Sequence, residues 1–479
     1  MQPTESSAFQ RRLNLFDSTA IVAGSMIGSG IFIVSSDIAR HLGSPGWLMM
    51  TWLITGILTV FAALSYGELA GMFPKAGGQY VYLKEAYNPL TGFLYGWTLF
   101  MVIQTGTIAA VAMAFAKYAG VLFPAISGNV TWFHSGFLKL GPVQIVAILS
   151  IVVLTWVNSR GIQAGKQVQN TFTTGKVMLL VLFIIIGLGF ATNHDAIRAN
   201  MDLFWTPQEF SGGTWQPISG FAVVAAIGMA MVGTLFSSDA WNNITFTAGE
   251  VINPRKNIPL SLFFGTLLVT VLYLLANVVY ITVLPIQGAP DGVTLAERGI
   301  SHAVQDRLAS AAMANVFGHY AALIMAGFIV ISTFGCNNGL ILSGARVYYA
   351  MARDGIFFTK IANLNNKGVP AYGLAFQAIW ASLLCLSGTY SDLLDYVIFA
   401  VLIFYVLTIF GIFILRRKQP LAERPYKAFG YPVVPAVYIL AATLIMAILL
   451  IYKPLYTWPG LLIVLVGIPV YYLWRRRDR

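Results

Sequence analysis

The stretch VAGSMIGSGIF, residues 22–32, decides how this chain folds, because it interrupts a long apolar run near the N-terminus. Three glycines and two serines fall within the seven residues from Gly24 to Gly30. Glycine inside a helix costs about 1 kcal/mol relative to alanine. If the run crosses a membrane, each peptide group that the break exposes must also find a partner within the protein. Such a break is either a defect or the site of a function.

The chain as a whole has the composition of an all-α integral membrane protein. Of its 479 residues, 57% are hydrophobic and 10% are charged, and its mean hydropathy is +0.74. A soluble protein carries about 25% charged residues. Apolar runs of about 20 residues, each long enough to cross a bilayer, recur from end to end. They predict twelve transmembrane helices: 16–41, 46–73, 89–123, 142–159, 165–191, 218–250, 257–285, 318–353, 370–388, 391–416, 432–452 and 455–474.

The distribution of basic residues predicts the orientation of these spans. With the N-terminus in the cytoplasm, 21 of the 29 lysines and arginines fall on the cytoplasmic side, as the positive-inside rule requires. We therefore expect both termini in the cytoplasm. The net charge of +11 then reflects orientation in the membrane rather than binding to nucleic acid.

A second break, LFSSDAWNN at residues 235–243, places polar residues in the middle of the sixth predicted span. Because the breaks fall in spans one and six, a unit of five spans would occur twice, and its second copy must enter from the opposite side. Interrupted helices at matching places in two inverted halves indicate a transporter site at the bilayer midplane. Two kinked helices that pack through glycine and serine are the alternative. The expected organisation is a cytoplasmic tail at 1–15, a first inverted repeat at 16–191, an outer loop at 192–217, a second repeat at 218–416, spans eleven and twelve with their preceding cytoplasmic loop at 417–474, and a cytoplasmic tail at 475–479.

Six motifs follow one another along the chain: GSMIGSGIF in span one, LSYGELAGMFPKAGGQYVYLKEAY at residues 64–87, TFTTGKVMLL in span five, FSSDAWNNITFTAGEVINPRKNIP in and after span six, RVYYAMARDG in span eight, and LRRKQPLAERPYKAFGYPVVP after span ten. In this order they resemble the amino acid–polyamine–organocation (APC) transporters over essentially the whole chain. The last motif and the pair Trp241–Asn242 look most like the L-type branch, which exchanges neutral amino acids. The resemblance implies a leucine-transporter-like fold with two inverted repeats and discontinuous helices one and six.

The breaks themselves suggest a substrate through their electrostatics. After the first break the helix restarts near residues 29–31, where free N–H groups and the positive end of the helix dipole suit a carboxylate. The first halves of both spans end near residues 25–26 and 236–237, where unpaired carbonyl oxygens suit an ammonium. One anion site beside one cation site describes the zwitterion of an α-amino acid.

The family resemblance implies the same roles. Ser29 and Gly30 would hold the carboxylate, and the carbonyls of Met26, Phe236 and Asp239 would hold the amine, with the Phe236 ring as a gate. The L-type pattern usually has glycine where this chain has Asp239, and the alternative role for this residue is an N-cap of the second half of span six. The expected substrate-binding residues are Ser25, Met26, Ile27, Gly28, Ser29, Gly30, Phe236, Ser237, Asp239 and Trp241.

Lys176 lies about ten residues beyond Lys166 in span five, or roughly 15 Å into the membrane at the rise of an α-helix. That depth exceeds comfortable snorkelling, so the side chain should face the interior with specific partners. In sodium-coupled relatives of this fold a sodium ion joins spans one and eight, and in the sodium-independent branch a lysine of span five takes its place. The resemblance assigns this role to Lys176, with Ser332 and carbonyls of residues 25–27 as partners. It predicts sodium independence and leaves open a fixed charge or a proton carrier.

Glu68 and Glu250 end spans two and six, where a carboxylate opposes the helix dipole and needs a basic neighbour. The candidate neighbours are Arg255, Lys256 and Arg346. Either pair could be structural or a cytoplasmic gate.

Two further residues are possible parts of a pocket or gate. Asn338 in span eight belongs to a family motif and lines the site or forms hydrogen bonds between helices. Leu402 in span ten stands where the L-type pattern has a bulky aromatic that bounds the side-chain pocket.

These features predict a secondary active transporter for neutral L-amino acids that works by alternating access, as a sodium-independent exchanger. The alternatives are a proton-coupled importer, a transporter of cationic amino acids or polyamines, and, from another class, a membrane enzyme or receptor. No catalytic residues, metal ligands or cofactors are expected. Both cysteines, Cys336 and Cys385, fall within predicted spans, so we expect no disulfide-linked accessory subunit. The short tails and the lack of organellar targeting favour a bacterial inner membrane.

Overall fold

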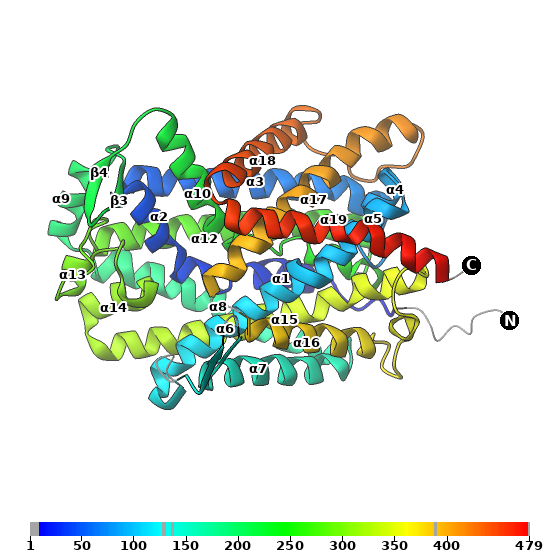
Figure 1. Cartoon of the computed structure of the whole chain (residues 1–479), viewed down its shortest axis with the longest axis horizontal. Coiled ribbons are helices and arrows are strands. Elements are labelled where there is room, and N and C mark those ends of the chain that lie inside the picture. Colours follow the sequence, from blue (N-terminus) through cyan, green and yellow to red (C-terminus); the bar gives the residue numbers. More distant parts are fainter. Residues whose placement is uncertain (1–8, 127–130, 136–137, 388–389, 478–479) are drawn as a thin grey trace.

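The computed structural model describes residues 9–126, 131–135, 138–387 and 390–477, and helices make up most of it (Figure 1). Residues 1–8 of the predicted N-terminal tail and residues 478–479 of the C-terminal tail lie outside the described part. The helices that correspond to predicted spans are α1 (Leu15–Met26), η2 (Gly30–Phe32), α2 (Val34–Leu42), α3 (Pro45–Met72), α5 (Pro89–Thr98), η3 (Leu99–Ile103), α6 (Gln104–Leu122), α7 (Pro142–Ser159), α8 (Ile162–Phe190), α10 (Phe221–Ser237), α11 (Asn243–Phe246), η5 (Ala248–Glu250), α12 (Pro254–Val283), α15 (His319–Arg353), α16 (Ala371–Cys385), α17 (Tyr390–Lys418), α18 (Val433–Tyr452) and α19 (Pro454–Arg477).

The remaining elements lie in the connections between these helices. Several that follow α8 or α12 gather at the end of the molecule opposite to the two chain termini (Figure 1). The predicted outer loop at 192–217 thus contains a helix and a β-hairpin. The connecting elements are α4 (Gln79–Ala86), η4 (Pro124–Ile126), the hairpin of β1 (Phe133–Ser135) and β2 (Leu138–Leu140), α9 (His194–Asp202), the hairpin of β3 (Gln208–Ser211) and β4 (Thr214–Pro217), α13 (Leu295–Arg298), η6 (Val304–Asp306), α14 (Leu308–Phe317) and η7 (Thr359–Ala362).

The prediction of an all-α membrane protein is confirmed. Within the described residues, nine helices are long and apolar enough to cross a membrane, and each coincides with a predicted span. Predicted span nine is the shorter apolar helix α16, and predicted spans one and six are interrupted where the sequence indicated. The total of twelve spans and the inverted repeat stay predictions.

The first helix begins at a capping box that also ties the N-terminus to the bundle. The Asn14 side chain accepts a hydrogen bond from the Asp17 N–H, and the Asp17 carboxylate accepts one from the Asn14 N–H, each at 2.9 Å. Such a box satisfies two amides that a helix start leaves free. Asp17 also pairs with Lys166 of α8 at 2.6 Å. Just before the cap, the Leu13 backbone pairs in parallel with Val251, directly after the end of span six. The ends of spans one, five and six on the predicted cytoplasmic side are therefore joined.

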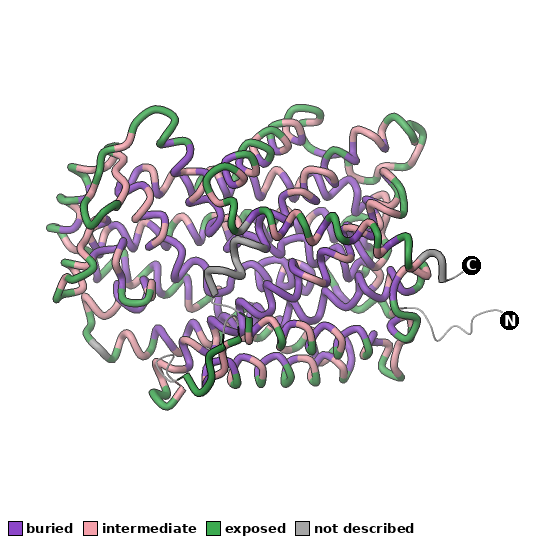
Figure 2. Tube along the Cα trace, in the orientation of Figure 1, coloured by how far each residue is buried: buried purple, intermediate pink, exposed green. Residues whose placement is uncertain are grey.

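The two interrupted spans lie inside a shell of continuous helices. Helix α1 packs on α8, α12 and α15, and α10 packs on α2, α3, α17 and α18. Burial is greatest in the middle of the molecule and falls towards its ends and edges (Figure 2). Large apolar side chains on the outer faces of α7, α8 and α12 are exposed, among them Trp156, Ile185 and Leu267. These faces suit contact with lipid, and the broken helices are kept away from it.

Candidate functional site

The first break separates α1 from α2 over residues 27–33. Helix α1 ends at Met26, and the Gly28 N–H turns back to the Met26 carbonyl at 2.8 Å. A short 3₁₀ turn, η2, then begins at Gly30 and leads into α2. The first amides of such a turn have no acceptor within the turn itself and point towards its N-terminal end. The predicted restart of the helix at residues 29–31 is where the structure places it.

The two breaks touch each other at Gly30. A Cβ atom at this position would lie 2.0 Å from the Ser237 Oγ and 3.0 Å from the Ser237 Cα. No real side chain fits at such distances, so glycine is what allows η2 to lie against the C-terminal end of α10. The Ser237 hydroxyl itself donates to the Gly233 carbonyl at 2.8 Å.

Lys176 holds the carbonyl oxygens of the first break together. Its ammonium, which is fully buried, donates to the carbonyls of Gly24 and Ile27, the latter at 2.7 Å, and lies 3.5 Å from the Ser332 carbonyl. The Ser332 hydroxyl donates to the same Ile27 oxygen at 3.2 Å. The structure thus brings Lys176, Ser332 and the break into contact, with Gly24 as an additional partner. A single positive charge here joins α1, α8 and α15.

Two residues at the first break were missed by the sequence analysis. The Tyr273 hydroxyl of α12 lies 3.0 Å from the Met26 carbonyl and 3.1 Å from the Ser237 carbonyl, so it bridges the two breaks. The Cys336 thiol of α15 donates to the Ser25 carbonyl at 3.0 Å. Both lie in long apolar spans, where nothing in the sequence marks a tyrosine or a cysteine as a partner of a broken helix.

The second break runs from the end of α10 to the start of α11. The Asp239 N–H still donates to the Phe236 carbonyl at 3.1 Å, and Ala240 then adopts a left-handed conformation with φ of 64°. The Asp239 carboxylate accepts a hydrogen bond of 2.5 Å from the Tyr405 hydroxyl of α17. The N-cap position of α11 belongs to Asn242. The alternative role of Asp239 as an N-cap is therefore wrong: its side chain faces α17 instead.

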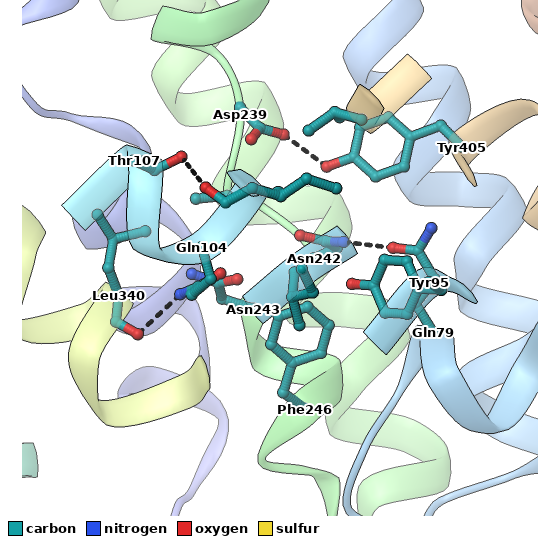
Figure 3. A pocket seen from close by; sticks show the side chains of 14 residues that line it. Gln79, Tyr95, Gln104, Thr107, Asp239, Asn242, Asn243, Phe246, Leu340 and Tyr405 are labelled. Carbon is teal, nitrogen blue, oxygen red and sulfur yellow. Dashed lines mark hydrogen bonds between the residues drawn. The ribbon is translucent and has the colours of Figure 1, made fainter. Parts of the chain in front are cut away.

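A small polar cavity lies beside the second break, between α6, α11, α15 and α17 (Figure 3). It leaves room for about one water molecule. Two polar groups that line it, the Tyr95 hydroxyl and the Asn243 Nδ2, are buried without a hydrogen-bond partner among the described residues. The lining residues are Gln79, Tyr95, Leu99, Ile103, Gln104, Thr107, Asp239, Ala240, Asn242, Asn243, Phe246, Leu340, Val401 and Tyr405.

One wall of this cavity comes from a π-helical turn in the third predicted span. The α5 helix gives way to the π-helix η3, and both ends of this turn, Leu99 and Ile103, line the cavity. Such turns insert an extra residue into a helix and occur frequently at functional sites. A run of apolar residues carries no sign of it, so the sequence analysis treated residues 89–123 as one regular span.

A second small cavity lies on the other side of Asp239 and includes Trp241 and Leu402 in its lining. The Trp241 ring packs edge-on against Tyr66, with centroids 4.7 Å apart. Of the predicted binding residues, only Asp239 lines both cavities. Neither cavity is lined by the predicted residues of the first break, 25–30, or by Phe236 and Ser237 of the second. The reason is that the two breaks pack directly on each other.

Three of the predicted polar residues, Glu250, Glu68 and Asn338, form contacts elsewhere in the bundle. Glu250 pairs with Arg346 at 3.0 Å, one of its expected neighbours, and both side chains are buried. For Glu68 the expected neighbours were wrong. It pairs with Arg416 at 2.6 Å and with Arg424 at 3.2 Å, because the segment after α17 folds back under α3.

Asn338 lines neither of the two cavities beside Asp239. Its side chain accepts a bond of 2.9 Å from Asn158 and donates to Gly165 and Gln169. These bonds join α7, α8 and α15, so hydrogen bonding between helices is the role that the structure shows.

Helix α2, which follows the first break, is fastened to the connection between α12 and α14. Arg40 of α2 donates to the Asp306 carboxylate at 2.7 Å and to the Ser301 carbonyl at 2.8 Å. Lys117 at the outer end of α6 donates to the Gln305 carbonyl at 2.9 Å. Burial, together with the positive charge of Arg40, lowers the pKa of the neighbouring His302 imidazole, so this loop histidine stays neutral near pH 7. The loop thus links α2 to α6.

Comparisons with known proteins identify the family. The family model described as amino acid permease matches residues 13–471. The human large neutral amino acids transporter small subunit 2 is 30% identical over 98% of this chain and 82% of its own length. The human b(0,+)-type amino acid transporter 1 is 30% identical over 98% of this chain and 89% of its own, and the mouse Asc-type amino acid transporter 1 is 28% identical over 99% and 84%. The resemblance to the APC transporters and their L-type branch is confirmed: the chain belongs to the amino acid permease family, and it is a multi-pass membrane transporter of amino acids, not an enzyme.

Proposed function

We propose that this protein is a sodium-independent exchanger of neutral L-amino acids that works by alternating access. The observation that carries the proposal is the buried Lys176 ammonium, which donates to the Gly24 and Ile27 carbonyls and reaches α15. A fixed cation at this point supplies the charge that a bound sodium ion would otherwise provide. The similar proteins include transporters named for large neutral amino acids, which supports the substrate class.

Recognition of the amino acid backbone would use both breaks. The N-terminal end of η2, at Gly30 and Ile31, presents amides and a positive dipole end to a carboxylate. The Met26 carbonyl already accepts from the Gly28 N–H and lies against the Tyr273 hydroxyl. A substrate ammonium that binds Met26 would therefore replace Tyr273, and this exchange of partners would separate the two breaks when the site fills.

The substrate side chain would point towards Asp239 and the cavities on its two sides. Tyr405 and Asp239, whose hydrogen bond is drawn in Figure 3, line both the polar cavity and the mixed one. Leu402 and Trp241 would bound the side chain on the mixed side. Each cavity is too small for an amino acid, so the binding site is nearly closed in this structure. The substrate can enter only when helices move.

Lys176 can act in either of two ways. As a fixed charge it holds α1 to α15 and its bonds persist through the cycle. As a proton carrier it would lose the bonds to Gly24 and Ile27 in one step of the cycle, and transport would then follow a proton gradient. We propose the fixed charge, because three backbone carbonyls surround the ammonium.

A second candidate function is supported by Asp239. Among the described residues this buried carboxylate accepts a side-chain hydrogen bond from Tyr405 alone, and it could bind the cationic side chain of arginine or lysine. One similar protein is a b(0,+)-type transporter. In this alternative the substrate cation would compete with the Tyr405 hydroxyl for Asp239.

The proposed organisation in the membrane follows the predicted one, with inverted repeats at 16–191 and 218–416 and both termini in the cytoplasm of a bacterium. The first described residues and the end of α19 lie at the same end of the molecule, which supports a common side for the termini (Figure 1). The chain has two cysteines, and both are free and buried. A disulfide to an accessory subunit would have no thiol at the surface to use.

The test uses purified protein in liposomes. Vesicles preloaded with neutral amino acids, or left empty, receive labelled leucine, alanine, serine or arginine outside, with or without sodium and a pH gradient. We expect uptake of the neutral substrates only into preloaded vesicles and no effect of sodium. Uptake into empty vesicles that follows an inward proton gradient would refute exchange. Transport of arginine alone would keep the family and replace the substrate class with the second candidate.

A further inference from the structure

A groove lies on the outer surface of the bundle, away from the two breaks. It forms between α3, α12 and the segment that joins α17 to α18, and it encloses about 790 Å³. Leu64, Leu260 and Phe263 form its apolar walls, and Phe429, which is 66% exposed, forms one edge. The groove therefore presents an apolar surface to the membrane.

Three basic side chains stand at the same groove: Arg255, Lys256 and Lys427. Arg255 pairs with Glu423 at 2.8 Å, but both side chains are more than half exposed, and such pairs are weak. Neither Lys256 nor Lys427 forms an ion pair in the part of the chain that the structure describes. The orientation predicted from the basic residues places all three at the cytoplasmic boundary of the membrane.

We propose that this groove is a binding site for an anionic phospholipid of the cytoplasmic leaflet. The phosphate would lie among Arg255, Lys256 and Lys427, and an acyl chain would follow the wall formed by Leu260 and Phe263. Basic pockets between transmembrane helices on the cytoplasmic side are known to attract anionic headgroups. The chemistry requires both parts, a negative headgroup and a long apolar tail.

The apolar surface extends beyond the groove in the direction that an acyl chain would take. Phe264, Leu267 and Val271 follow Phe263 along α12 and are 48%, 40% and 45% exposed. They continue the apolar wall for about two helical turns towards the bilayer centre. A soluble anion would contact only the basic rim and leave this surface unused.

The groove is held open by contacts on its inner side. The Glu68 carboxylate accepts bonds from Arg416 and from the Ala428 N–H at 2.6 and 2.7 Å, which fixes the segment after α17. The Tyr426 ring of that segment packs closely on α3, where a Cβ atom at Gly67 would be 2.8 Å from it. The site is therefore formed before a lipid arrives, and its walls belong to two transmembrane helices.

The experiment measures lipid binding to the full chain by native mass spectrometry, with phosphatidylglycerol and phosphatidylcholine of identical acyl chains as probes. The variant Arg255→Gln/Lys256→Gln/Lys427→Gln removes the basic rim. Its matched control, Lys75→Gln/Lys360→Gln/Lys367→Gln, removes the same charge from exposed cytoplasmic positions elsewhere. We expect the first variant to lose about tenfold or more in phosphatidylglycerol affinity, because each basic residue near a headgroup contributes about 1 kcal/mol. The control variant should keep its affinity for phosphatidylglycerol.

A second variant tests the apolar wall. Leu260→Trp fills the groove and keeps every charge, and it should weaken phosphatidylglycerol binding as strongly as the loss of the basic rim. Soluble glycerol phosphate should not displace the lipid. Equal losses in the rim variant and its control, full binding by Leu260→Trp, or displacement by glycerol phosphate would each overturn the proposal. If the triple variant does not fold, Lys427→Gln alone, expected to lose severalfold, decides the question.

Discussion

Replacing Lys176 by methionine removes the positive charge from the first break while it keeps most of the side-chain volume. A hydrogen bond from a charged donor contributes about 1.5–3 kcal/mol, and a buried carbonyl left without a donor costs about 1–3 kcal/mol. The Ile27 oxygen would keep the Ser332 hydroxyl at 3.2 Å. The lost hydrogen bonds therefore affect mainly the Gly24 carbonyl, near the end of α1.

From these values we expect the break to lose about 2.5–6 kcal/mol of stabilisation. Every 1.4 kcal/mol corresponds to about a tenfold change. If half of a mid-range loss of about 4 kcal/mol affects the transport cycle, the exchange rate of Lys176→Met should fall about tenfold or more. Lys176→Gln, which can still donate one hydrogen bond but has no charge, should retain more activity than Lys176→Met if hydrogen bonds dominate, and no more if charge dominates.

The assay is exchange of labelled leucine in preloaded proteoliposomes, at equal protein incorporation and after a thermal-melting check of each variant. Lys360→Met, which removes an exposed lysine far from the breaks in the sequence, is the matched control and should leave exchange unchanged. Wild-type exchange by a folded Lys176→Met would refute the reasoning. A wild type that follows an imposed pH gradient, with a Lys176→Met variant that exchanges but no longer responds, would make Lys176 a proton carrier.

Further substitutions test the contacts between the breaks and around them. Tyr273→Phe removes the hydroxyl that the substrate ammonium has to displace from the Met26 carbonyl, at about 1 kcal/mol, and should lower the KM for leucine about fivefold, with the melting temperature nearly unchanged. Gly30→Ala places a Cβ atom 2.0 Å from the Ser237 Oγ; it should lower the melting temperature and abolish exchange, and Ser237→Gly should partly restore both. Asp239→Asn should preserve leucine exchange, whereas any arginine exchange should disappear; loss of leucine exchange alone would contradict our placement of the side chain. Asp306→Asn frees Arg40 and should lower the external KM up to about fivefold, the range of an exposed ion pair; a raised KM would show that the contact does not hold the site shut.

The sequence predicts the broken helices and the lysine between them because each violates a rule of the membrane interior. Glycines and serines in an apolar run, and a lysine about 15 Å deep, are costly unless something specific compensates. Such costs are visible without coordinates. The contact of Lys176 with Ser332 followed from the family resemblance.

Other features depend on packing that no local pattern records. Tyr273 reaches both breaks only because α12 lies across α1, and Asp239 faces Tyr405 only because Ala240 turns the chain with a positive φ. The partners of Glu68 were wrong because the segment after α17 folds back over a distance that no helical spacing describes. The apolar sequence around η3 likewise gives no indication of the π-helical turn. Charges at unusual depth can thus be read from sequence, and the directions of side chains cannot.

The most direct test of the account is a structure of the protein in a lipid nanodisc with a saturating neutral amino acid that it exchanges. We predict that the carboxylate lies at the Gly30 and Ile31 amides and the ammonium at the Met26 carbonyl in place of the Tyr273 hydroxyl. The side chain should point towards Asp239, and Lys176 should keep its bonds to Gly24 and Ile27. An amino acid bound away from the two breaks, or one bound there with Tyr273 still on Met26, would contradict the account.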